Sequence, residues 1–542
     1  MITRRKFVKQ TLQAAAGSSL LLSSMQACKP RTIAGSMQGP NAALGHKLRA
    51  MQFDPPSENI HTSVVIVGGG VAGLSAARYL KRATNDFILL ELGDDTGGNS
   101  IGGSNAAGAY PWGAHYLPLP GNNDPELMAF LQDAQVITGY ENDLPVYNEY
   151  YLCFDPKERL YINHYWQDGI IPHEGIGIKD REQIERFLAM MNDFRQQLDA
   201  DGREAFAIPV DCSSQDAKYR QLDAISMETF LQNNGFTSPY LHWYVNYCCA
   251  DDYGSSLTET SAWAGIHYFA SRKGKAANAS YDSVLTWPEG NYWLVKQLRK
   301  NIASHIYTGA LAYHIEPTNT GVDILYYDAV KKQTIKISAQ TAIVATPQFV
   351  NQRMLPGKIN RSLDYTRFEY APWMVANITL SASLEERKGE QLCWDNVIYG
   401  SDAVGYVNAS HQLISFVPEQ NIITYYKPLL GKDIRAIRQQ AYQRNWNEWK
   451  DIILKDLQQP HPRIEQYIER MDIWVWGHGM IKPSPGFIWS ADRKNAAAPV
   501  GEKIFFAHSD LSGISIFEHA FYHGHTAARQ ALNALLTARS IL

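Results

Sequence analysis

The feature that most constrains the fold is a run of β-branched residues followed by a glycine-rich turn. Val64-Val65-Ile66-Val67 is a continuous apolar run, as expected for a strand buried on both faces of a parallel sheet. Gly68, Gly70 and Gly73 follow in the pattern G-x-G-x-x-G, and residues 74–81 have the composition of a helix. A second apolar run, residues 87–90, ends at Glu91. The order strand, helix, strand predicts a βαβ unit.

Each glycine in this turn has a separate physical task. The first permits the tight turn from strand to helix, the second lets a pyrophosphate approach the backbone, and the third lets the helix pack close to the strand. The start of the helix then offers free N–H groups and a partial positive charge to phosphates. A carboxylate at the end of the second strand can accept hydrogen bonds from ribose hydroxyls. The pattern therefore predicts a dinucleotide site that contains Gly68, Gly70, Val71, Ala72, Gly73 and Glu91.

Two further stretches indicate that the dinucleotide is a flavin. Gly97-Gly98-Asn99 is a second glycine-rich segment just past Glu91. Near the C-terminus, Asp510 follows an apolar run, and Glu518-His519-Ala520 begins a helix. With these segments the chain resembles the flavin-containing amine oxidase and phytoene desaturase superfamily. The resemblance runs from about residue 63 to residue 535 and implies FAD as the cofactor.

The resemblance also implies roles for single residues. In the superfamily a glycine pair followed by arginine lies along the FAD, and Asn99 stands here in place of the arginine. Asp510 matches the acid that holds the ribitol. Glu518-His519-Ala520 matches the helix start that directs N–H groups at the flavin, with His519 in place of a glycine. Ala312 begins a segment similar to the one that contacts the adenine. The covalent-flavin cysteine of the family has no match, so the FAD is expected to bind noncovalently.

The predicted fold class is α/β, with a discontinuous Rossmann-like FAD-binding domain and an inserted α+β substrate domain. A chain of 542 residues is longer than one hydrophobic core usually supports. The apolar stretches 341–347 and 503–507 are typical of buried strands, and they are predicted to belong to the same nucleotide domain although they come late in the chain. The predicted boundaries are a signal at 1–28, a linker at 29–60, an FAD-binding domain at 61–140, 281–350 and 490–542, and a substrate-binding domain at 141–280 and 351–489.

The expected chemistry is hydride transfer from a C–H bond to the flavin, so the protein must orient the substrate and control its protonation. An aromatic cage suits an amine, because ring faces attract the cation. Trp474 and Trp476 alternate on a strand-like run and point to one face, and Tyr522 is a further candidate. His115 is the candidate acid or base, and Lys482 could match the lysine that amine oxidases hold near the flavin. A structural role, in the core or on the surface, is the alternative for each of these residues.

The N-terminus predicts export. Arg4-Arg5 precedes Phe7 and an apolar stretch that ends near residue 25, which resembles a twin-arginine signal. The twin-arginine machinery, a predicted partner, carries folded proteins. Met25-Gln26-Ala27-Cys28 resembles a lipoprotein cleavage box, so Cys28 is expected to carry a lipid anchor. The expected location is the periplasm or the outer side of the cytoplasmic membrane.

Other partners are limited by charge and cysteine spacing. A net charge of −4 lacks the excess of positive charge that is typical of proteins that bind nucleic acid, and the cysteines follow no metal-binding pattern. A small-molecule substrate is expected. Three functions stay open: an oxidase or dehydrogenase of an amine or amino acid, a desaturase or isomerase of an apolar lipid or polyene, and a noncatalytic flavin-binding lipoprotein.

Overall fold

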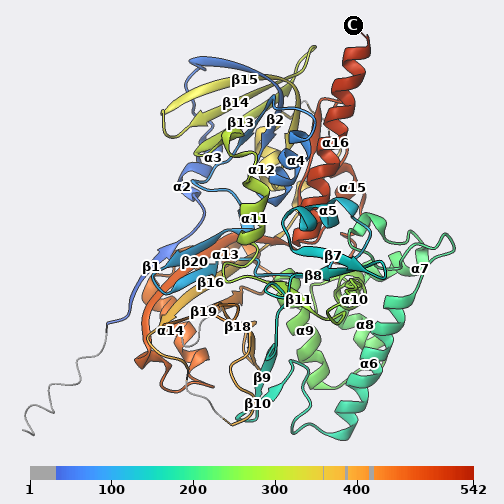
Figure 1. Ribbon diagram of the computed structural model, residues 1–542, viewed down its shortest axis with the longest axis vertical. Helices are drawn as coiled ribbons and strands as arrows, with labels where there is room; N and C mark the ends of the chain where they lie inside the picture. The colour runs from blue at the N-terminus through green and yellow to red at the C-terminus, as the bar shows by residue number, and fades with distance from the viewer. Residues whose placement is uncertain (1–31, 358, 360, 385–387, 414–419, 542) are drawn as a thin grey trace, which may run out of the picture.

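The structure is a computed structural model that describes residues 32–541 except 358, 360, 385–387 and 414–419. The predicted twin-arginine signal and Cys28 lie outside the described residues. Figure 1 shows two lobes: a seven-stranded sheet supports the upper lobe, and an eight-stranded sheet supports the lower one. In the described part of the chain, no helix combines the length and apolar character needed to cross a membrane.

The upper sheet confirms the predicted α/β architecture. Its strand order is β12-β3-β2-β15-β14-β13, and β21 pairs with β15. The pairs β12–β3, β2–β3, β2–β15 and β15–β21 are parallel, while β13–β14 and β14–β15 are antiparallel. The strands are β2 (Glu58–Val67), β3 (Phe87–Leu90), β12 (Ile306–Tyr307), β13 (Ala310–Pro317), β14 (Val322–Asp328), β15 (Gln333–Val344) and β21 (Ile504–Phe506). The sheet therefore collects strands from three separate stretches of the chain.

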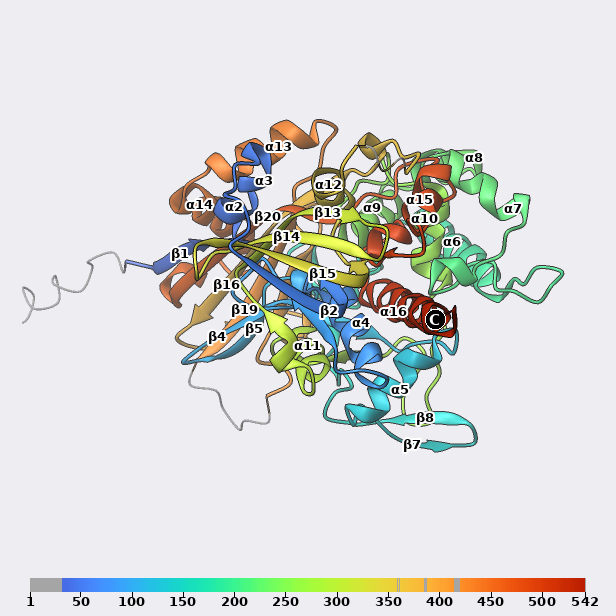
Figure 2. The ribbon, with the colours of Figure 1, turned by 90° about the horizontal axis from the view of Figure 1, so that it is seen from above.

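Helices cover one face of this sheet. Val64 and Ile66 on β2 pack into one core with α4 (Val71–Lys81), α5 (Pro125–Asp133), α11 (Tyr292–Arg299) and α16 (Phe517–Ile541). Figure 2 shows α4 and α16 side by side. Their approach is close, because a Cβ at Gly524 would lie 2.2 Å from the carbonyl oxygen of Ala72. The end of the chain is thus held directly against the first helix of the nucleotide unit.

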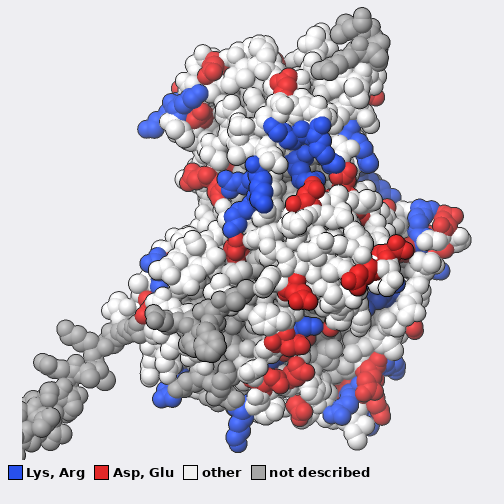
Figure 3. Space-filling view, viewed as in Figure 1, with Lys and Arg blue, Asp and Glu red and all other residues white. Residues whose placement is uncertain are grey.

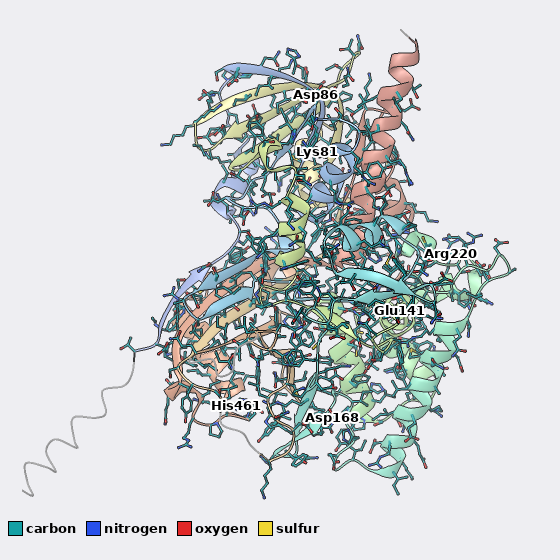
Figure 4. The ribbon with its side chains drawn as sticks, in the orientation of Figure 1. Lys81, Asp86, Glu141, Asp168, Arg220 and His461 are labelled. Carbon is teal, nitrogen blue, oxygen red and sulfur yellow. The ribbon has the colours of Figure 1, made fainter. Side chains whose placement is uncertain are left out.

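Polar contacts fix the end of the βαβ unit that lies opposite the glycine turn. Asp86, labelled in Figure 4, precedes β3 and accepts hydrogen bonds from Thr62 Oγ1 at 2.8 Å and Ser63 Oγ at 2.6 Å. Lys81 ends α4 and donates to Asn85 Oδ1 at 2.6 Å. Figure 3 shows basic side chains grouped on this face over α4 and α11. The contacts of Asp86 hold the start of β3 against β2.

The lower sheet has the order β1-β20-β16-β19-β18-β17-β9-β10. Its strands are β1 (Ala34–Gln38), β9 (Glu158–Ile162), β10 (Tyr165–Asp168), β16 (Tyr370–Leu380), β17 (Asp395–Ile398), β18 (Gly405–Asn408), β19 (Asn421–Pro428) and β20 (Ile468–Ile481). One core joins this sheet to α6 (Ile178–Gln196), α8 (Met227–Asn233), α9 (Pro239–Tyr253) and α10 (Ala262–Ala270). A second core joins it to α13 (Ile434–Gln443) and α14 (Trp446–Leu457). Because helices cover both faces, every residue of β16 is buried.

The prediction of a linker at 29–60 is wrong for much of that range. β1 pairs in parallel with β20, from Ala34 opposite Arg470 to Gln38 opposite Trp474. The helices α2 (Ala42–Gly45) and α3 (Lys47–Ala50) follow, and they bury Leu44 and Leu48 against the upper lobe. The segment looked like a linker because a short edge strand has little local periodicity, and its partner lies more than 400 residues further along the chain.

Candidate active site

A cavity of about 1220 Å³ lies where the two lobes meet. Its walls come from the turn between β2 and α4, the segments that follow β3 and β15, the start of α16, and parts of α3, α12 (Gln348–Met354), α13 and β20. The upper lobe thus contributes the carboxyl ends of parallel strands, which is where open α/β sheets bind their ligands. The lower lobe closes the opposite side.

The glycine turn has the geometry that a dinucleotide requires. Gly68 has φ of +107°, and a Cβ there would lie 2.5 Å from the carbonyl oxygen of Ala345. A Cβ at Gly73 would lie 1.8 Å from the carbonyl oxygen of Gly68, so only glycine lets α4 approach this closely. Gly70 precedes α4 without a side-chain cap, and Val71 and Ala72 line the cavity. The first N–H groups of α4 are therefore left for a ligand phosphate.

Glu91 lies beside this turn. Its Oε2 accepts a hydrogen bond from the Gly69 N–H at 2.7 Å, and its Oε1 accepts one from the Gly93 N–H at 2.6 Å. Burial raises the pKa of Glu91, and these two hydrogen bonds act in the opposite direction. Each oxygen keeps acceptor capacity for a ribose hydroxyl. Glu91 also lines the cavity, as a ribose-binding acid must.

The second glycine-rich segment packs on the first. Gly97 and Gly98 have φ of +133° and +56°, and the Gly97 N–H donates to the carbonyl oxygen of Gly69 at 2.9 Å. Asn99 lines the cavity, and its Nδ2 donates to the carbonyl oxygen of Gly479 on β20. Asn99 thus links the two lobes and supplies no positive charge to a pyrophosphate.

Positive charge reaches the cavity from other elements, which the sequence reasoning missed. Arg49 on α3, Arg353 on α12, and Arg435 and Arg438 on α13 all line it. Arg438 donates to the carbonyl oxygen of Tyr370 at 3.1 Å and to that of Gly477. Guanidinium groups are well suited to phosphate. The glycine turns, the carboxylate and this arginine wall together fit an extended dinucleotide such as FAD.

Not all of the residues predicted to bind the rest of the FAD line the first cavity. Asp510 is fully buried at the first cavity, and its Oδ2 accepts hydrogen bonds from the Gln348 N–H at 2.9 Å and from the Tyr370 hydroxyl. Ala312 and Ala520 also line this cavity. Glu518 and His519 do not, contrary to the prediction of cofactor contacts. The His519 ring lies in the core, with Nδ1 3.1 Å from the carbonyl oxygen of Ile514, and Glu518 lines a second cavity.

This second cavity has a volume of about 150 Å³ and shares walls with the first. Asn99, Ala114, Trp476, Gly479 and the segment 515–517 line both. Its own walls include the aromatic rings of Tyr116, Trp373 and Tyr426. A molecule in the second cavity would therefore lie directly beside one bound in the first.

Four charged side chains line the second cavity: Asp251, Asp252, Arg272 and Glu518. Arg272 Nη2 donates to both carboxylate oxygens of Asp252, at 2.6 and 2.8 Å. Burial raises the pKa of Asp251, and neighbouring Asp252 raises it further. Burial also raises the pKa of Glu518, to about 7. The Glu518 carboxylate accepts a hydrogen bond from its own backbone N–H. In the part of the chain that the structure describes, neither Asp251 nor Glu518 forms an ion pair.

His115 lies in the same cavity. Its ring stacks on Tyr426 with centroids 4.6 Å apart and lies 5.6 Å from the ring of Trp394. Burial lowers the pKa of His115 to about 4, so the ring is neutral at neutral pH. A neutral imidazole can accept a hydrogen bond from a substrate amine.

Of the other predicted catalytic residues, only Trp476 lines the cavities. Trp474 packs between Trp476 and Trp112. Lys482 is only 2% exposed and pairs with Glu259 at 2.9 Å. Tyr522 lies on α16 with its ring 5.4 Å from that of His525. The predicted catalytic roles of Trp474, Lys482 and Tyr522 are therefore corrected to structural ones.

Sequence reasoning also missed most of the second cavity. Asp251 and Asp252 lie in the last turn of α9, shortly after Cys248 and Cys249. Two adjacent acids in an otherwise apolar helix were the one sequence signal that could have indicated this cavity. Arg272, Trp373 and Tyr426 are brought there by tertiary folding alone. Across the described residues, no group of three or more His, Cys, Asp and Glu side chains is arranged to hold a metal ion.

The fold and the first cavity define a protein of the dinucleotide-binding class. A family profile for NAD(P)-binding Rossmann-like domains matches residues 66–134. An L-amino acid dehydrogenase from Synechocystis sp. is 24% identical over 295 residues, which cover 54% of this chain and 57% of that protein. The chain thus matches little more than half the length of this relative.

Solved structures match over nearly the whole chain. Putrescine oxidase bound to putrescine has a TM-score of 0.61 at 13% identity, covering 88% of this chain and 100% of that one. Cyclohexylamine oxidase from Brevibacterium oxydans has a TM-score of 0.62 at 13% identity, and the match covers 88% of this chain and 99% of that one. A CLA-producing fatty acid isomerase from P. acnes has a TM-score of 0.58 at 14% identity, and the match covers 86% of this chain and 98% of that one. The chain therefore shares the fold of these two amine oxidases and of the isomerase, as the resemblance in its motifs predicted.

Proposed function

We propose that this protein is an FAD-dependent oxidoreductase that transfers a hydride from an organic amine or amino acid to FAD. The observation that supports the proposal is the shared wall of the two cavities: a cavity suited to a dinucleotide borders a small aromatic cavity that is also lined by Asp251 and Glu518. A substrate in the small cavity would lie against one end of the cofactor, as hydride transfer requires.

We propose that FAD binds noncovalently. The first N–H groups of α4 would meet the pyrophosphate, Glu91 would accept from the adenosine ribose, and the arginine wall would balance the phosphate charge. Asp510 would hold the ribitol. Among the described residues, no cysteine lines either cavity, which supports noncovalent binding.

The chain's residues must deliver a neutral amine for the reaction. When bound, FAD accepts the hydride and its two electrons from the carbon next to the nitrogen. The amine also loses a proton, and the product is an imine that water can hydrolyse. Glu518, with a pKa of about 7, is placed to take that proton, and neutral His115 can accept a hydrogen bond from the amine. The aromatic walls exclude water from this exchange.

The carboxylates of the second cavity favour an amine over the alternative of an apolar lipid or polyene. An apolar chain beside Asp251 and Glu518 would desolvate them without giving them a partner, which is costly. The likeness to a fatty acid isomerase concerns the fold alone. A noncatalytic flavin-binding lipoprotein would need no second cavity beside the cofactor.

An anaerobic reduction screen tests the proposed function. The protein is purified with its native cofactor and mixed with amines, amino acids, alcohols and unsaturated fatty acids without oxygen. We expect amines to bleach the flavin absorbance. Bleaching by fatty acids or polyenes alone would contradict an amine substrate. A bound flavin that no compound reduces would support the noncatalytic alternative.

We further propose that the protein is exported by the twin-arginine machinery and anchored through Cys28. Export would make dioxygen, a quinone or a carrier protein the electron acceptor, since nicotinamide nucleotides are scarce outside the cytoplasm. Replacing Arg4 and Arg5 by lysine should keep the protein in the cytoplasm. The variant Cys28→Ser should move it from the membrane fraction to the soluble periplasmic fraction, and an unchanged distribution would contradict the anchor.

A further inference from the structure

We propose that Trp373 sets the size limit of the second cavity, and that the part of the substrate around the reacting carbon is no larger than about one benzene ring. This inference rests on the proposed function and adds the residue that determines substrate size. Trp373 is part of the walls of the second cavity and not of the first, so it would contact the substrate and not the cofactor.

The volume of the second cavity leads to the size limit. The cavity measures about 150 Å³, against about 1220 Å³ for the first. An apolar cavity of about 150 Å³, engineered in another protein, binds benzene. A group of benzene size therefore fits the second cavity, whereas two fused rings need more room than the cavity offers.

The lower sheet forms one wall of this cavity. Trp373 on β16 lies opposite Trp476 on β20, and Val375 lies opposite Tyr426 on β19. Opposed residues of antiparallel strands project from the same face of a sheet, and all four of these residues line the second cavity. The position of Trp373 is therefore fixed by strand pairing and does not depend on a loop.

A bulge makes room for the Trp373 ring. The pairing of β16 with β20 shifts between Ala371 and Trp373, where β20 carries extra residues within 477–479. Bulges of this kind re-aim side chains beside active sites. Gly479 lies in the bulge, and a Cβ there would lie 2.9 Å from Trp373 Cδ1. The ring thus occupies space that a side chain at position 479 would need.

A second glycine packs against the same ring. Gly254 ends α9 with φ of +59°, and a Cβ there would lie 2.5 Å from Trp373 Nε1. The indole therefore fills a hollow that two glycines leave empty of side chains. Removal of the indole would join this hollow to the cavity that the indole lines.

Trp373 is held by its shape and not by a hydrogen bond. Its Nε1 is buried and has no hydrogen-bond partner among the residues that the structure describes. Two other aromatic walls are tied to the backbone: Trp476 Nε1 donates to the carbonyl oxygen of Trp112 at 2.7 Å, and the Tyr426 hydroxyl donates to that of Gly113 at 3.0 Å. Shortening Trp373 therefore enlarges the cavity and leaves no protein group with a broken hydrogen bond.

Two amines that differ by one fused ring test the inference on the holoprotein. They are benzylamine and naphthylmethylamine, which share the same reacting carbon and amino group. The half-saturating concentration for anaerobic flavin reduction is measured for each. We expect wild type to need a concentration of naphthylmethylamine higher by about tenfold or more, because the second ring overfills the cavity. A wild-type protein that accepts both amines equally would overturn the size limit.

Variants assign the size limit to Trp373. Trp373→Leu should bring the two half-saturating concentrations to within about threefold of each other, because the second ring can enter the hollow beside Gly254 and Gly479. Trp373→Phe keeps an aromatic ring and should lower the ratio by less. An unchanged ratio in either variant would overturn the role of Trp373.

Trp449→Leu is the matched control. Trp449 is also a fully buried indole whose Nε1 has no hydrogen-bond partner in the described part of the chain, but it lines neither cavity. Its replacement should lower the melting temperature, as that of Trp373 does, and keep the wild-type ratio. A Trp449→Leu protein that also accepts the naphthyl amine would show that any lost indole relaxes the cavity, which would overturn the inference. Flavin content and circular dichroism establish that each variant is folded.

Calorimetric binding of the two amines to the holoprotein separates this inference from the proposed function. A preference for benzylamine that disappears in Trp373→Leu, without any flavin reduction, would support the inference and overturn the proposed function. Equal affinities in wild type would overturn the inference, even where both amines reduce the flavin. If the holoprotein binds neither amine, both fall.

Discussion

At the scale of single residues, Gly73 shows how one backbone contact decides whether the cofactor site forms. A Cβ at this position would lie 1.8 Å from the carbonyl oxygen of Gly68. Gly73→Ala should push α4 away from β2, destabilise the protein by about 1 to 3 kcal/mol, and lower the FAD content of the purified protein. Gly139→Ala is the matched control, because nothing lies within 4 Å of its added Cβ. The flavin-to-protein absorbance ratio and the melting temperature are measured, and a G73A protein that retains full flavin content would contradict this account.

Glu518 predicts a pH dependence of stability. Burial raises its pKa from 4.5 to about 7 in the folded protein, so the folded state keeps the proton to a higher pH than the unfolded state does. This stabilisation is complete below about pH 4.5 and is lost as the pH rises through about 7. Between pH 4.5 and 8, wild type should lose up to about 3 kcal/mol relative to Glu518→Gln. Melting curves without amine check this, with exposed Glu185→Gln on α6 as the control. Parallel curves for wild type and E518Q would contradict a buried, proton-holding Glu518.

The predicted residues that the structure places at the first cavity share a local cause. The conformations of Gly68 and Gly73, and the position of Glu91 after β3, follow from a strand, a turn and a helix that are consecutive in sequence. Asp252 and Arg272 meet through packing between α9 and the segment after α10, and nothing near either residue indicates the other. Lys482 was predicted to lie near the flavin because its partner, Glu259, is equally remote in sequence and could not be foreseen.

At the scale of elements, β1 is the segment whose role the sequence concealed. The strand adds to the edge of β20, and a Cβ at Gly35 would lie 2.1 Å from the carbonyl oxygen of Met471 and 2.5 Å from Trp446 Nε1. Gly35 is therefore required for the pairing, although in sequence it reads as one small residue among others. The strand β3 and the C-terminal parts of β2 and β15 were predictable, because burial on both faces makes residues 87–90, 64–67 and 342–344 continuous apolar runs.

Gly35→Ala should detach β1 and, with it, the α3 residues that line the cofactor cavity, such as Arg49. We expect faster hydrogen exchange in residues 34–50 and FAD binding weakened by about tenfold, the size of one lost charge-assisted contact. Gly39→Ala is the control, since its Cβ would lie 3.5 Å from the carbonyl oxygen of Val475, an ordinary contact. If both variants bind FAD like wild type, the N-terminal segment has no part in holding the cofactor.

At the scale of the whole molecule, the discontinuous nucleotide domain could be predicted because its separate stretches each carry a local motif. The second lobe could not, since its strands pair over long distances and its cavity walls combine α9, β16, β19 and the start of α16. The chemistry needs both lobes. One lobe offers the phosphate-binding turn, and the other supplies α13, β20 and most of the aromatic walls.

Because the walls of the long cavity come from both lobes, FAD should stabilise the whole molecule and not the nucleotide lobe alone. A ligand present at 100 times its Kd stabilises the folded state by about 2.7 kcal/mol. Removing FAD from the holoprotein should therefore lower the melting temperature of a single cooperative transition, and adding FAD should restore it. ADP or riboflavin alone would contact only part of the cavity and should restore less. The measurement is calorimetry on apoprotein with each ligand. A holoprotein that melts in two steps, of which only one responds to FAD, would contradict a cofactor that joins the lobes.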